Sequence, residues 1–530
     1  FIIILCYTLI VKLKTEEWRN NMSDIIIMVS IVVYLLVVVA IGIQYSKKNK
    51  SSDDFYLGGR KLGPFVTAMS AEASDMSSWL LMGLPGVAYL TGVADAAWTA
   101  IGLAIGTYIN WLIVAKRIRM YSQGYDAFTV PDFFSKRFGG CKTLSCIAAI
   151  MIVVFFVPYT ASGFAACGKL FSSLFGVSYL SAMVISAAVI VCYCTLGGFL
   201  AASTTDLIQS IVMSVALIVV VVFGINVAGG FDVVDNAKQL PGYLGLFKTY
   251  SAETGTASNY SFLKICSTLA WGLGYFGMPH ILLRFMAIED EKKLKLSRRV
   301  ASIWVVISLS VAVFIGIVGY GMSKAGALDI LTGSNSETII VKIAHLLSTH
   351  GVIAAIAAGV ILAGILAATM STSDSQLLAA ASGISQNLVR ECMGVKLSEK
   401  AALIVARITV VIISIVAVFM AGNPDSSVFE IVSFAWAGFG ATFGPVVLLS
   451  LFWRRANKYG AISGMISGGI MIFLWKYVIS GFGGVFAIYE LLPAFIVAII
   501  VNVVVSLLTK APSKEVLDKY DEVRAIEINA

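Results

Sequence analysis

Charged side chains are scarce in this chain. They make up 13% of its 530 residues, whereas 58% of the residues are hydrophobic. An ordinary soluble protein carries roughly 25% charged residues, so the composition excludes a soluble globular domain. Apolar runs of the roughly 20 residues that cross a bilayer recur along almost the whole sequence, which also excludes a soluble domain on a single anchor. The sequence therefore predicts a multi-pass protein embedded in a lipid bilayer.

Signatures of several other functions are missing. The eight cysteines form no CxxC pair, the three histidines have no metal-ligand spacing, and no G-x-x-x-x-G-K-[ST] motif for ATP occurs. The net charge of +8 comes from short basic clusters between apolar runs, a pattern of cytoplasmic loops rather than of a nucleic-acid-binding surface. We expect no enzymatic reaction, no organic cofactor, no nucleic acid and no obligate protein partner.

The apolar runs are continuous and lack the alternation of barrel strands, so they predict an all-α membrane protein. We expect about thirteen transmembrane helices, at residues 24–45, 66–91, 95–115, 144–170, 177–196, 206–229, 262–286, 300–322, 348–385, 402–421, 428–452, 460–480 and 487–508.

Basic residues gather in alternate loops of this arrangement. They include Lys47, Lys48, Lys50, Arg60, Lys61, Lys116, Arg117, Arg119, Lys136, Arg137, Lys142, Lys292, Lys293, Lys295, Arg298, Arg299, Arg454, Arg455 and Lys458. By the positive-inside rule these loops and the tail at 511–530 are cytoplasmic, and the N-terminus is outside. Met22 is the expected start, with residues 1–21 an upstream or non-native extension and 22–62 the first helix and its loop.

Two of the expected helices are interrupted. The second contains "SAEASDMSS" and then Gly83, Pro85 and Gly86, and the seventh contains "WGLGYFGMP". Interrupted segments at corresponding places in two halves indicate a transporter built from inverted repeats. We expect the repeats at 63–230 and 231–455, followed by two additional helices at 456–510.

The ninth helix carries a candidate cation site. Ser371 and Thr372 follow Ala368 by three and four residues, so all three share one helical face. Neutral oxygen ligands suit a monovalent cation that must also leave. If the second helix unwinds near residue 75, the carbonyls of Ala73 and Met76 could complete a site for Na⁺.

Carboxylates at membrane depth usually face a water-filled path or a partner. Asp75 is expected to attract the cation or to hold the unwound segment. Asp206 either caps a helix or takes part in ion binding, and Asp374, beside Ser375, belongs to a second cation site or to the cytoplasmic exit. Glu72 lies three residues before Asp75. Its carboxyl group suggests two hypotheses that stay open: transport depends on protons, or its ion stoichiometry is altered.

Trp271, Tyr275 and Pro279 recur at helical spacing in the seventh segment. They form either a packing stripe or an aromatic wall beside a midplane cavity, which would suit a small, compact substrate.

At these residues the sequence resembles the sodium/solute symporter family, and within it the bacterial sodium/proline symporters. The resemblance extends from Met22 onward and rests on "DDFYLGGRKLGPFVTAMSAEASDMSSWLLMGLPG", "GLAIGTYINWLIVAKRIR", "WGLGYFGMPHILLRFMA" and "MSTSDSQLL". It implies a LeuT-type core of five plus five inverted helices and uptake of L-proline coupled to Na⁺ across the bacterial cytoplasmic membrane.

The resemblance also assigns residues. It places the sodium ligands at Ala73, Met76, Ala368, Ser371 and Thr372, and ion-coupling positions at Asp75, Ser77, Arg60 and Asp206. The positions that line or gate the proline site are Trp79, Tyr159, Trp271, Tyr275 and Pro279, and Ser77 and Ser78 belong to the same binding region. Glu72, Ser78 and Met278 depart from the family pattern, and Ser78 bears on fine specificity.

Two other functions remain open at this point. The same machinery could carry another small solute, such as a different amino acid, a sialic acid or pantothenate. A transporter-like sensor is a further alternative, although it needs a signalling domain and the tail at 511–530 is short.

Overall fold

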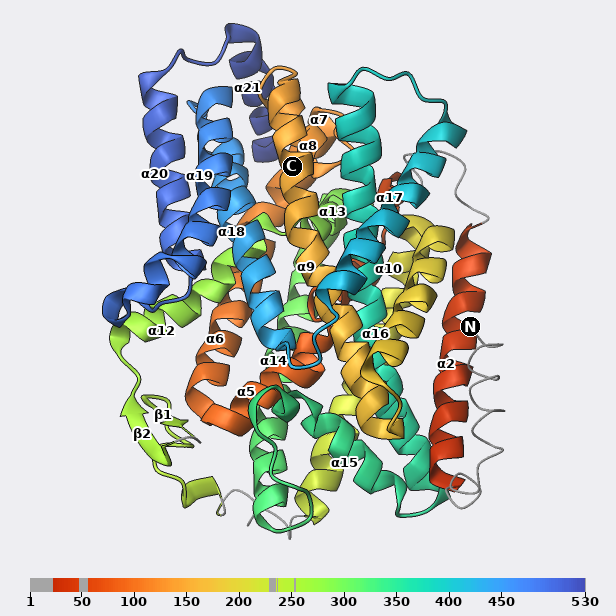
Figure 1. Cartoon of the computed structure of the whole chain (residues 1–530). Helices are drawn as coiled ribbons and strands as arrows, with labels where there is room; N and C mark the ends of the chain where they lie inside the picture. Colours follow the sequence, from red (N-terminus) through yellow and green to blue (C-terminus); the bar gives the residue numbers. More distant parts are fainter. Residues whose placement is uncertain (1–21, 47–55, 228–234, 236, 252–253, 530) are drawn as a thin grey trace.

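The computed structural model describes residues 22–46, 56–227, 235, 237–251 and 254–529, and it forms a bundle of long helices (Figure 1). The expectations for residues 1–21 and for Lys47, Lys48 and Lys50 lie outside the described residues. Within them, ten helices are long and apolar enough to cross a membrane. The other three predicted ranges, 66–91, 177–196 and 262–286, fall on shorter or interrupted helices. The all-α membrane fold is therefore confirmed, whereas the count of thirteen stays a prediction.

The second predicted helix is broken as expected. Helix α4 (Pro64–Asp75) ends where Met76 leaves helical geometry, with φ −78° and ψ 63°. The chain resumes as a π-helical turn, η3 (Trp79–Gly83), and continues as α5 (Leu84–Thr91). The break lies at the run of small and hydroxyl residues that the sequence shows between two apolar stretches.

The seventh predicted helix is broken in a different way. Helix α12 (Phe262–Leu269) passes into a 3-10 segment, η5 (Ala270–Gly277), before Met278 becomes extended. Pro279 then occupies the first turn of α13 (Pro279–Ala287), where its missing N–H leaves no helical bond unmade. Both interruptions are buried.

Helix α10 (Tyr179–Val227) contains two of the predicted helices in one element. It is interrupted at Gly198, whose φ of 71° and ψ of 179° are open to glycine but strained for other residues. The helix bends there, and Asp206 lies inside its second half.

The remaining helices follow the predicted ranges within several residues. They are α2 (Met22–Ser46), α6 (Val93–Ile109) with η4 (Asn110–Val114) and α7 (Ala115–Gly124), α9 (Lys142–Phe175), α14 (Leu294–Lys324), α16 (Val352–Ser382) with η8 (Gly383–Cys392), α17 (Glu399–Met420), α18 (Val428–Phe452), α19 (Lys458–Tyr477) and α20 (Leu491–Leu508). Helix α2 packs on α10 and α16, and α19 and α20 pack on α18, which places the first helix and the last two on different sides of the bundle (Figure 1).

Several elements were not predicted. They are the short helices α8 (Val130–Arg137) and α15 (Ile339–Ser348), the tail helix α21 (Lys514–Asn529) and an antiparallel hairpin of β1 (Lys248–Ser251) and β2 (Thr256–Asn259). The tail at 511–530, for which the sequence analysis gave no secondary structure, is mostly helical. Helices α7, α8 and α21 lie at one end of the bundle, and α15 and the hairpin lie toward the other (Figure 1).

Candidate ion and substrate site

The predicted cation face meets the break in the second helix. The Ser371 hydroxyl donates to the carbonyl of Ala73 at 2.8 Å and is also within 3.1 Å of the carbonyl of Ala368. Three of the five predicted sodium ligands, from two elements almost 300 residues apart, therefore converge. All three residues are fully buried.

The other two predicted ligands flank this contact in the chain. Thr372 is 2% exposed, and its hydroxyl has no hydrogen-bond partner among the described residues. Met76, whose carbonyl is the fifth predicted ligand, is the first residue after α4. A buried hydroxyl without a partner is costly, so a polar ligand at Thr372 is expected on energetic grounds.

Asp75 links the two broken helices. Its Oδ2 accepts a hydrogen bond from the Tyr275 hydroxyl at 2.6 Å, and its carbonyl accepts one from the Tyr159 hydroxyl at 3.1 Å. Its other carboxylate oxygen has no partner among the described residues. Glu72, one turn earlier in α4, accepts a hydrogen bond from the Trp111 indole at 2.9 Å. The two carboxyl groups are both buried, so the segment before the break carries acidic groups without a basic partner of their own in the described hydrogen bonds.

Aromatic side chains gather beside Asp75. Trp79 and Trp271, both predicted, have ring centroids 5.9 Å apart. Phe429, at the start of α18, lies 5.3 Å from Trp271 and 6.4 Å from Trp79. The indole of Trp436 donates to the Trp271 carbonyl at 2.7 Å, and its ring is 5.0 Å from that of Tyr275. Trp271 and Tyr275 thus belong to an aromatic cluster shared by three elements, and the packing-stripe and wall interpretations both remain predictions.

Three other predicted residues of this region, Ser77, Ser78 and Pro279, lie outside the aromatic cluster. The Ser77 hydroxyl accepts from the Trp79 amide at 3.3 Å, and the buried Ser78 hydroxyl has no partner among the residues that the structure describes. Pro279 begins α13. Ser78 is therefore a polar group at the break that a bound molecule could satisfy.

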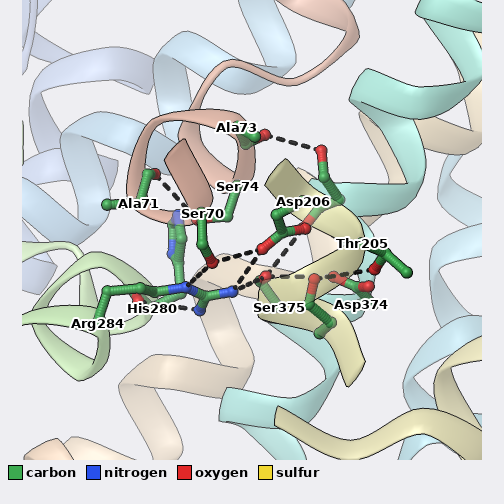
Figure 2. Close-up of polar contacts among 12 residues, drawn as sticks. Ser70, Ala71, Ala73, Ser74, Thr205, Asp206, His280, Arg284, Asp374 and Ser375 are labelled. Carbon is green, nitrogen blue, oxygen red and sulfur yellow. Dashed lines mark hydrogen bonds and ion pairs between the residues drawn. The ribbon is translucent and has the colours of Figure 1, made fainter. Parts of the chain in front are cut away.

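A second polar cluster centres on Arg284 of α13 (Figure 2). Its guanidinium pairs with Asp206 Oδ2 at 3.2 Å and donates to the hydroxyls of Ser70, at 3.0 Å, and Ser375. Ser70 also donates to Asp206 at 2.6 Å, and Ser375 reaches Asp374 Oδ1 at 3.2 Å. The arginine thus contacts Asp206 directly and is linked to Asp374 through Ser375, and each aspartate keeps one buried oxygen without a partner among the described residues.

The cap interpretation of Asp206 is wrong. The residue lies inside α10, a full turn and more beyond Gly198, and its side chain is directed at Arg284 and Ser70 rather than at amides of a first helical turn. The ion-binding alternative remains as a prediction.

Arg60 lies apart from these clusters. Its guanidinium donates to the carbonyls of Met286, at 2.6 Å, and Ala127, at 2.7 Å, and to the hydroxyl of Ser122 at 3.0 Å. Through these bonds it joins the segment before α4 to the ends of α7 and α13, and none of the three acceptors is a predicted sodium ligand.

Sequence reasoning missed Arg284, Phe429 and Trp436. Arg284 carried a usable signal, because a lone arginine in the apolar run "HILLRFMA" must find a buried partner. Phe429 and Trp436 gave no such signal, since aromatic residues are common in apolar helices.

The chain is similar to known proteins over most of its length. Residues 55–468 match the sodium:solute symporter family. The chain is 40% identical over 494 residues to the osmoregulated proline transporter OpuE of Bacillus subtilis, covering 92% of this chain and 96% of that relative. It is 41% identical over 502 residues to the sodium/proline symporter of Escherichia coli, covering 94% and 96%.

Solved structures share the fold. A Na⁺-coupled sialic acid symporter in a substrate-bound outward-open state superposes with a TM-score of 0.74 at 18% identity, covering 92% of this chain and 98% of that one. MhsT in complex with L-phenylalanine gives a TM-score of 0.55 at 14% identity, with coverages of 84% and 98%. These neighbours agree with the predicted LeuT-type core, and the sequence matches identify the chain as a member of the sodium:solute symporter family.

Proposed function

We propose that the protein is a sodium-coupled symporter that takes up L-proline by alternating access. The family membership supports sodium as the coupling ion, and two relatives with 40% and 41% identity are named as proline transporters. The observation that carries the mechanism is the Ser371 hydroxyl, which bridges carbonyls of α16 and of the broken second helix.

The sodium site is proposed at Ala73, Met76, Ala368, Ser371 and Thr372. In the described state the Ser371 hydroxyl donates to the carbonyl of Ala73, and a bound cation would instead draw both oxygens toward itself as ligands. Because the ligands come from α4 and α16, ion binding would favour the arrangement in which these elements are close. Differential binding of this kind lets an ion shift a conformational equilibrium.

A second cation site is proposed at Asp206, Asp374 and Ser375. Two aspartates facing one arginine leave a net negative charge when all three groups are ionised, and such a charge is unfavourable in the membrane interior. A monovalent cation would neutralise it. Asp75 and Ser77 are proposed to couple this region to the substrate, whereas Arg60 would act at a distance, through the ends of α7 and α13.

The substrate site is proposed beside the break at Asp75. Trp271, Tyr275, Trp79 and Tyr159 would pack against the apolar ring of proline, and Ser77, Ser78 and Pro279 would border it. The carboxylate of the substrate would meet the partial positive charge at a half-helix N-terminus.

The architecture assigned to this function has two inverted repeats, 63–230 and 231–455, and two further helices at 456–510. The two breaks, in α4–α5 and in α12–α13, open the two halves at corresponding places, which supports the assignment. The end of the bundle with α7, α8 and α21 would face the cytoplasm because these helices carry many of the basic residues.

Uptake of radiolabelled L-proline into proteoliposomes tests the proposal directly. The wild type should accumulate proline when an inward Na⁺ gradient is imposed, and the Ser371→Ala/Thr372→Ala variant should lose this accumulation. Ser382→Ala is a matched control, because Ser382 is also buried in α16 but bonds within its own turn, to the carbonyl of Ala379.

Two outcomes would contradict parts of the proposal. If the wild type does not accumulate proline but is stabilised by Na⁺, the symporter mechanism stands and another amino acid, a sialic acid or pantothenate becomes the candidate solute. If the double variant keeps full Na⁺-dependent uptake, the proposed sodium site is wrong.

A further inference from the structure

Arg137 is buried at the end of the bundle that holds α7, α8 and α21 (Figure 1). The residue is 0% exposed. A guanidinium keeps its charge in proteins, and arginine is almost never fully buried unless it is paired. Within the part of the chain that the structure describes, its Nε donates to the carbonyl of Ser450 at 3.0 Å, whereas Nη1 and Nη2 have no hydrogen-bond partner. A buried positive charge is thus left with most of its N–H groups unbonded.

Two other buried arginines show what is missing. Arg119, at the same end of the bundle, donates from each of its three nitrogens, at 2.7, 2.6 and 3.5 Å. Arg284 forms an ion pair with Asp206 and donates from its other nitrogens as well. Among the described residues, Arg137 has no carboxylate within ion-pair distance and a single carbonyl as acceptor.

Aromatic rings surround the guanidinium of Arg137 instead. Its central carbon lies 4.4 Å from the ring centroid of Tyr520 and 5.1 Å from that of Phe138. Tyr520 belongs to α21, and its hydroxyl donates to the carbonyl of Leu451, near the end of α18, at 3.1 Å. A ring face attracts a cation but offers no oxygen lone pair to the N–H groups. The rings therefore offset part of the buried charge and leave its hydrogen bonds unmade.

Two hydroxyl groups of the same cluster also lack a partner among the described residues. Ser450, whose carbonyl accepts from Arg137, is 0% exposed, and its own hydroxyl has none. The hydroxyl of Tyr125, at the end of α7, is buried and has none either. The Tyr125 ring lies 6.4 Å from that of Phe133, which is one helical turn before Arg137 on the same face of α8. The cluster thus offers a positive charge and hydroxyl groups that can donate.

We propose that one small monovalent anion, of the size of chloride, binds at Nη1 and Nη2 of Arg137, with the hydroxyls of Ser450 and Tyr125 as further donors. The carboxylate next to Tyr520 is not available for this role, because both oxygens of Asp521 accept from Arg454. A monovalent anion balances the single charge of the guanidinium, whereas a dianion would leave an excess of negative charge in a buried setting. A water molecule would satisfy the N–H groups but would leave the charge unbalanced.

The bound anion would hold the tail helix on the bundle. Tyr520 of α21 packs on the guanidinium, so release of this helix opens the site to solvent. A ligand that binds only the closed arrangement stabilises it, and the equilibrium for opening falls by the factor 1 + [L]/Kd. No residue of the proposed sodium, second-cation or substrate sites takes part, so the inference does not depend on the proposed function.

The experiment uses the full chain in nanodiscs of phosphatidylcholine, whose headgroups carry no net charge. The sodium concentration is constant, and the anion is chloride, bromide or gluconate, which is too large for a buried site. Hydrogen exchange of the α21 amides and the thermal unfolding midpoint are measured in each salt. The variants are Arg137→Lys, which keeps the charge but lacks the planar fork, and Ser450→Ala. Arg119→Lys is the matched control, because the nitrogens of Arg119 are already bonded.

We expect the anion to protect the tail helix in the wild type. At a chloride or bromide concentration of about ten times the dissociation constant, the α21 amides should exchange about tenfold more slowly than in gluconate, and the unfolding midpoint should rise. Arg119→Lys should keep this dependence on the anion. Arg137→Lys should lose most of it, and Ser450→Ala should need a higher chloride concentration for the same protection.

Three results would overturn the proposal. Equal exchange of the wild-type α21 amides in all three salts would favour bound water, and an undiminished chloride dependence in Arg137→Lys would place the anion elsewhere. Wild-type crystals grown in sodium bromide give a test that needs no variant to fold. An anomalous peak is expected within hydrogen-bond distance of Nη1 and Nη2, and the lack of a peak there is the third contrary result. Transport is not measured, so a failure of the proposed function leaves these outcomes unchanged.

Discussion

The Tyr275 hydroxyl donates a 2.6 Å hydrogen bond to the carboxylate of Asp75, across 200 positions of the sequence. The two residues belong to the two broken helices, one at the end of α4 and the other in the 3-10 segment η5. Helix breaks normally leave backbone and side-chain polar groups unsatisfied, and here each break supplies a partner for the other. The two interruptions are therefore one structural unit.

Removal of this hydrogen bond should impair transport. In Tyr275→Phe the carboxylate loses a donor in a buried setting, where a hydrogen bond to a charged group contributes roughly 1.5–3 kcal/mol. We expect kcat/KM for Na⁺-driven proline uptake to fall by roughly 10- to 150-fold. Tyr108→Phe is the control, since the Tyr108 side chain is 46% exposed, and its uptake should match the wild type. Wild-type kinetics in Tyr275→Phe would show that the link has no part in coupling.

Thr372→Val should separate ion binding from folding. Valine has a similar shape and lacks the hydroxyl, which is buried without a partner among the described residues. Without Na⁺ the unfolding midpoint should therefore stay the same or rise. With Na⁺ the wild type should be stabilised and the variant should not, with at least about a tenfold rise in the Na⁺ concentration for half-maximal uptake.

The control for this substitution lies one turn earlier in α16. Thr369 donates its hydroxyl to the carbonyl of Ile365 at 2.9 Å, so its hydroxyl is already satisfied within its own helix. Thr369→Val should keep the Na⁺-dependent stabilisation. If both variants lose it, the effect belongs to the packing of α16 and not to the hydroxyl of Thr372.

The sequence predicted the helices and their breaks because both depend on local chemistry. Apolar runs, Pro279 and the small polar residues before Asp75 each act within one segment. The convergence of Ala73 with Ser371 was predicted from helical spacing together with the assumption that the second helix unwinds. The pairing of Asp206 with Arg284 was not predicted, because it depends on how α10 and α13 pack, and no spacing rule within one helix reports that. The same reason explains why Phe429 and Trp436 were missed.

The Asp206–Arg284 pair can be tested by a double-mutant cycle. Both side chains are at most 1% exposed, so the removal of one partner leaves a buried charge with reduced compensation. Asp206→Leu and Arg284→Met should each lower the free energy of unfolding by roughly 3–5 kcal/mol, and the double variant should lose less than the sum. The measurement is thermal or denaturant unfolding in nanodiscs. Additive losses would mean that Asp374 and the serines, and not Asp206, balance the arginine.

The tail helix offers a test of pH dependence outside the membrane. Arg454 donates to both carboxylate oxygens of Asp521, at 2.9 and 3.0 Å, and its guanidinium holds the pKa of Asp521 below the ordinary value. A lowered folded-state pKa means that the ion pair contributes fully above the ordinary pKa of about 3.9 and is lost as the pH falls through the lower, folded-state pKa. Because both side chains are about half exposed, solvent screens the pair and its contribution should be small. Hydrogen exchange of the α21 amides should therefore accelerate slightly, relative to intrinsic rates, at acid pH in the wild type.

In Asp521→Asn the protection of these amides should be lower near neutral pH, and the acid transition should be absent. A transition that persists in this variant would show that another carboxylate causes it.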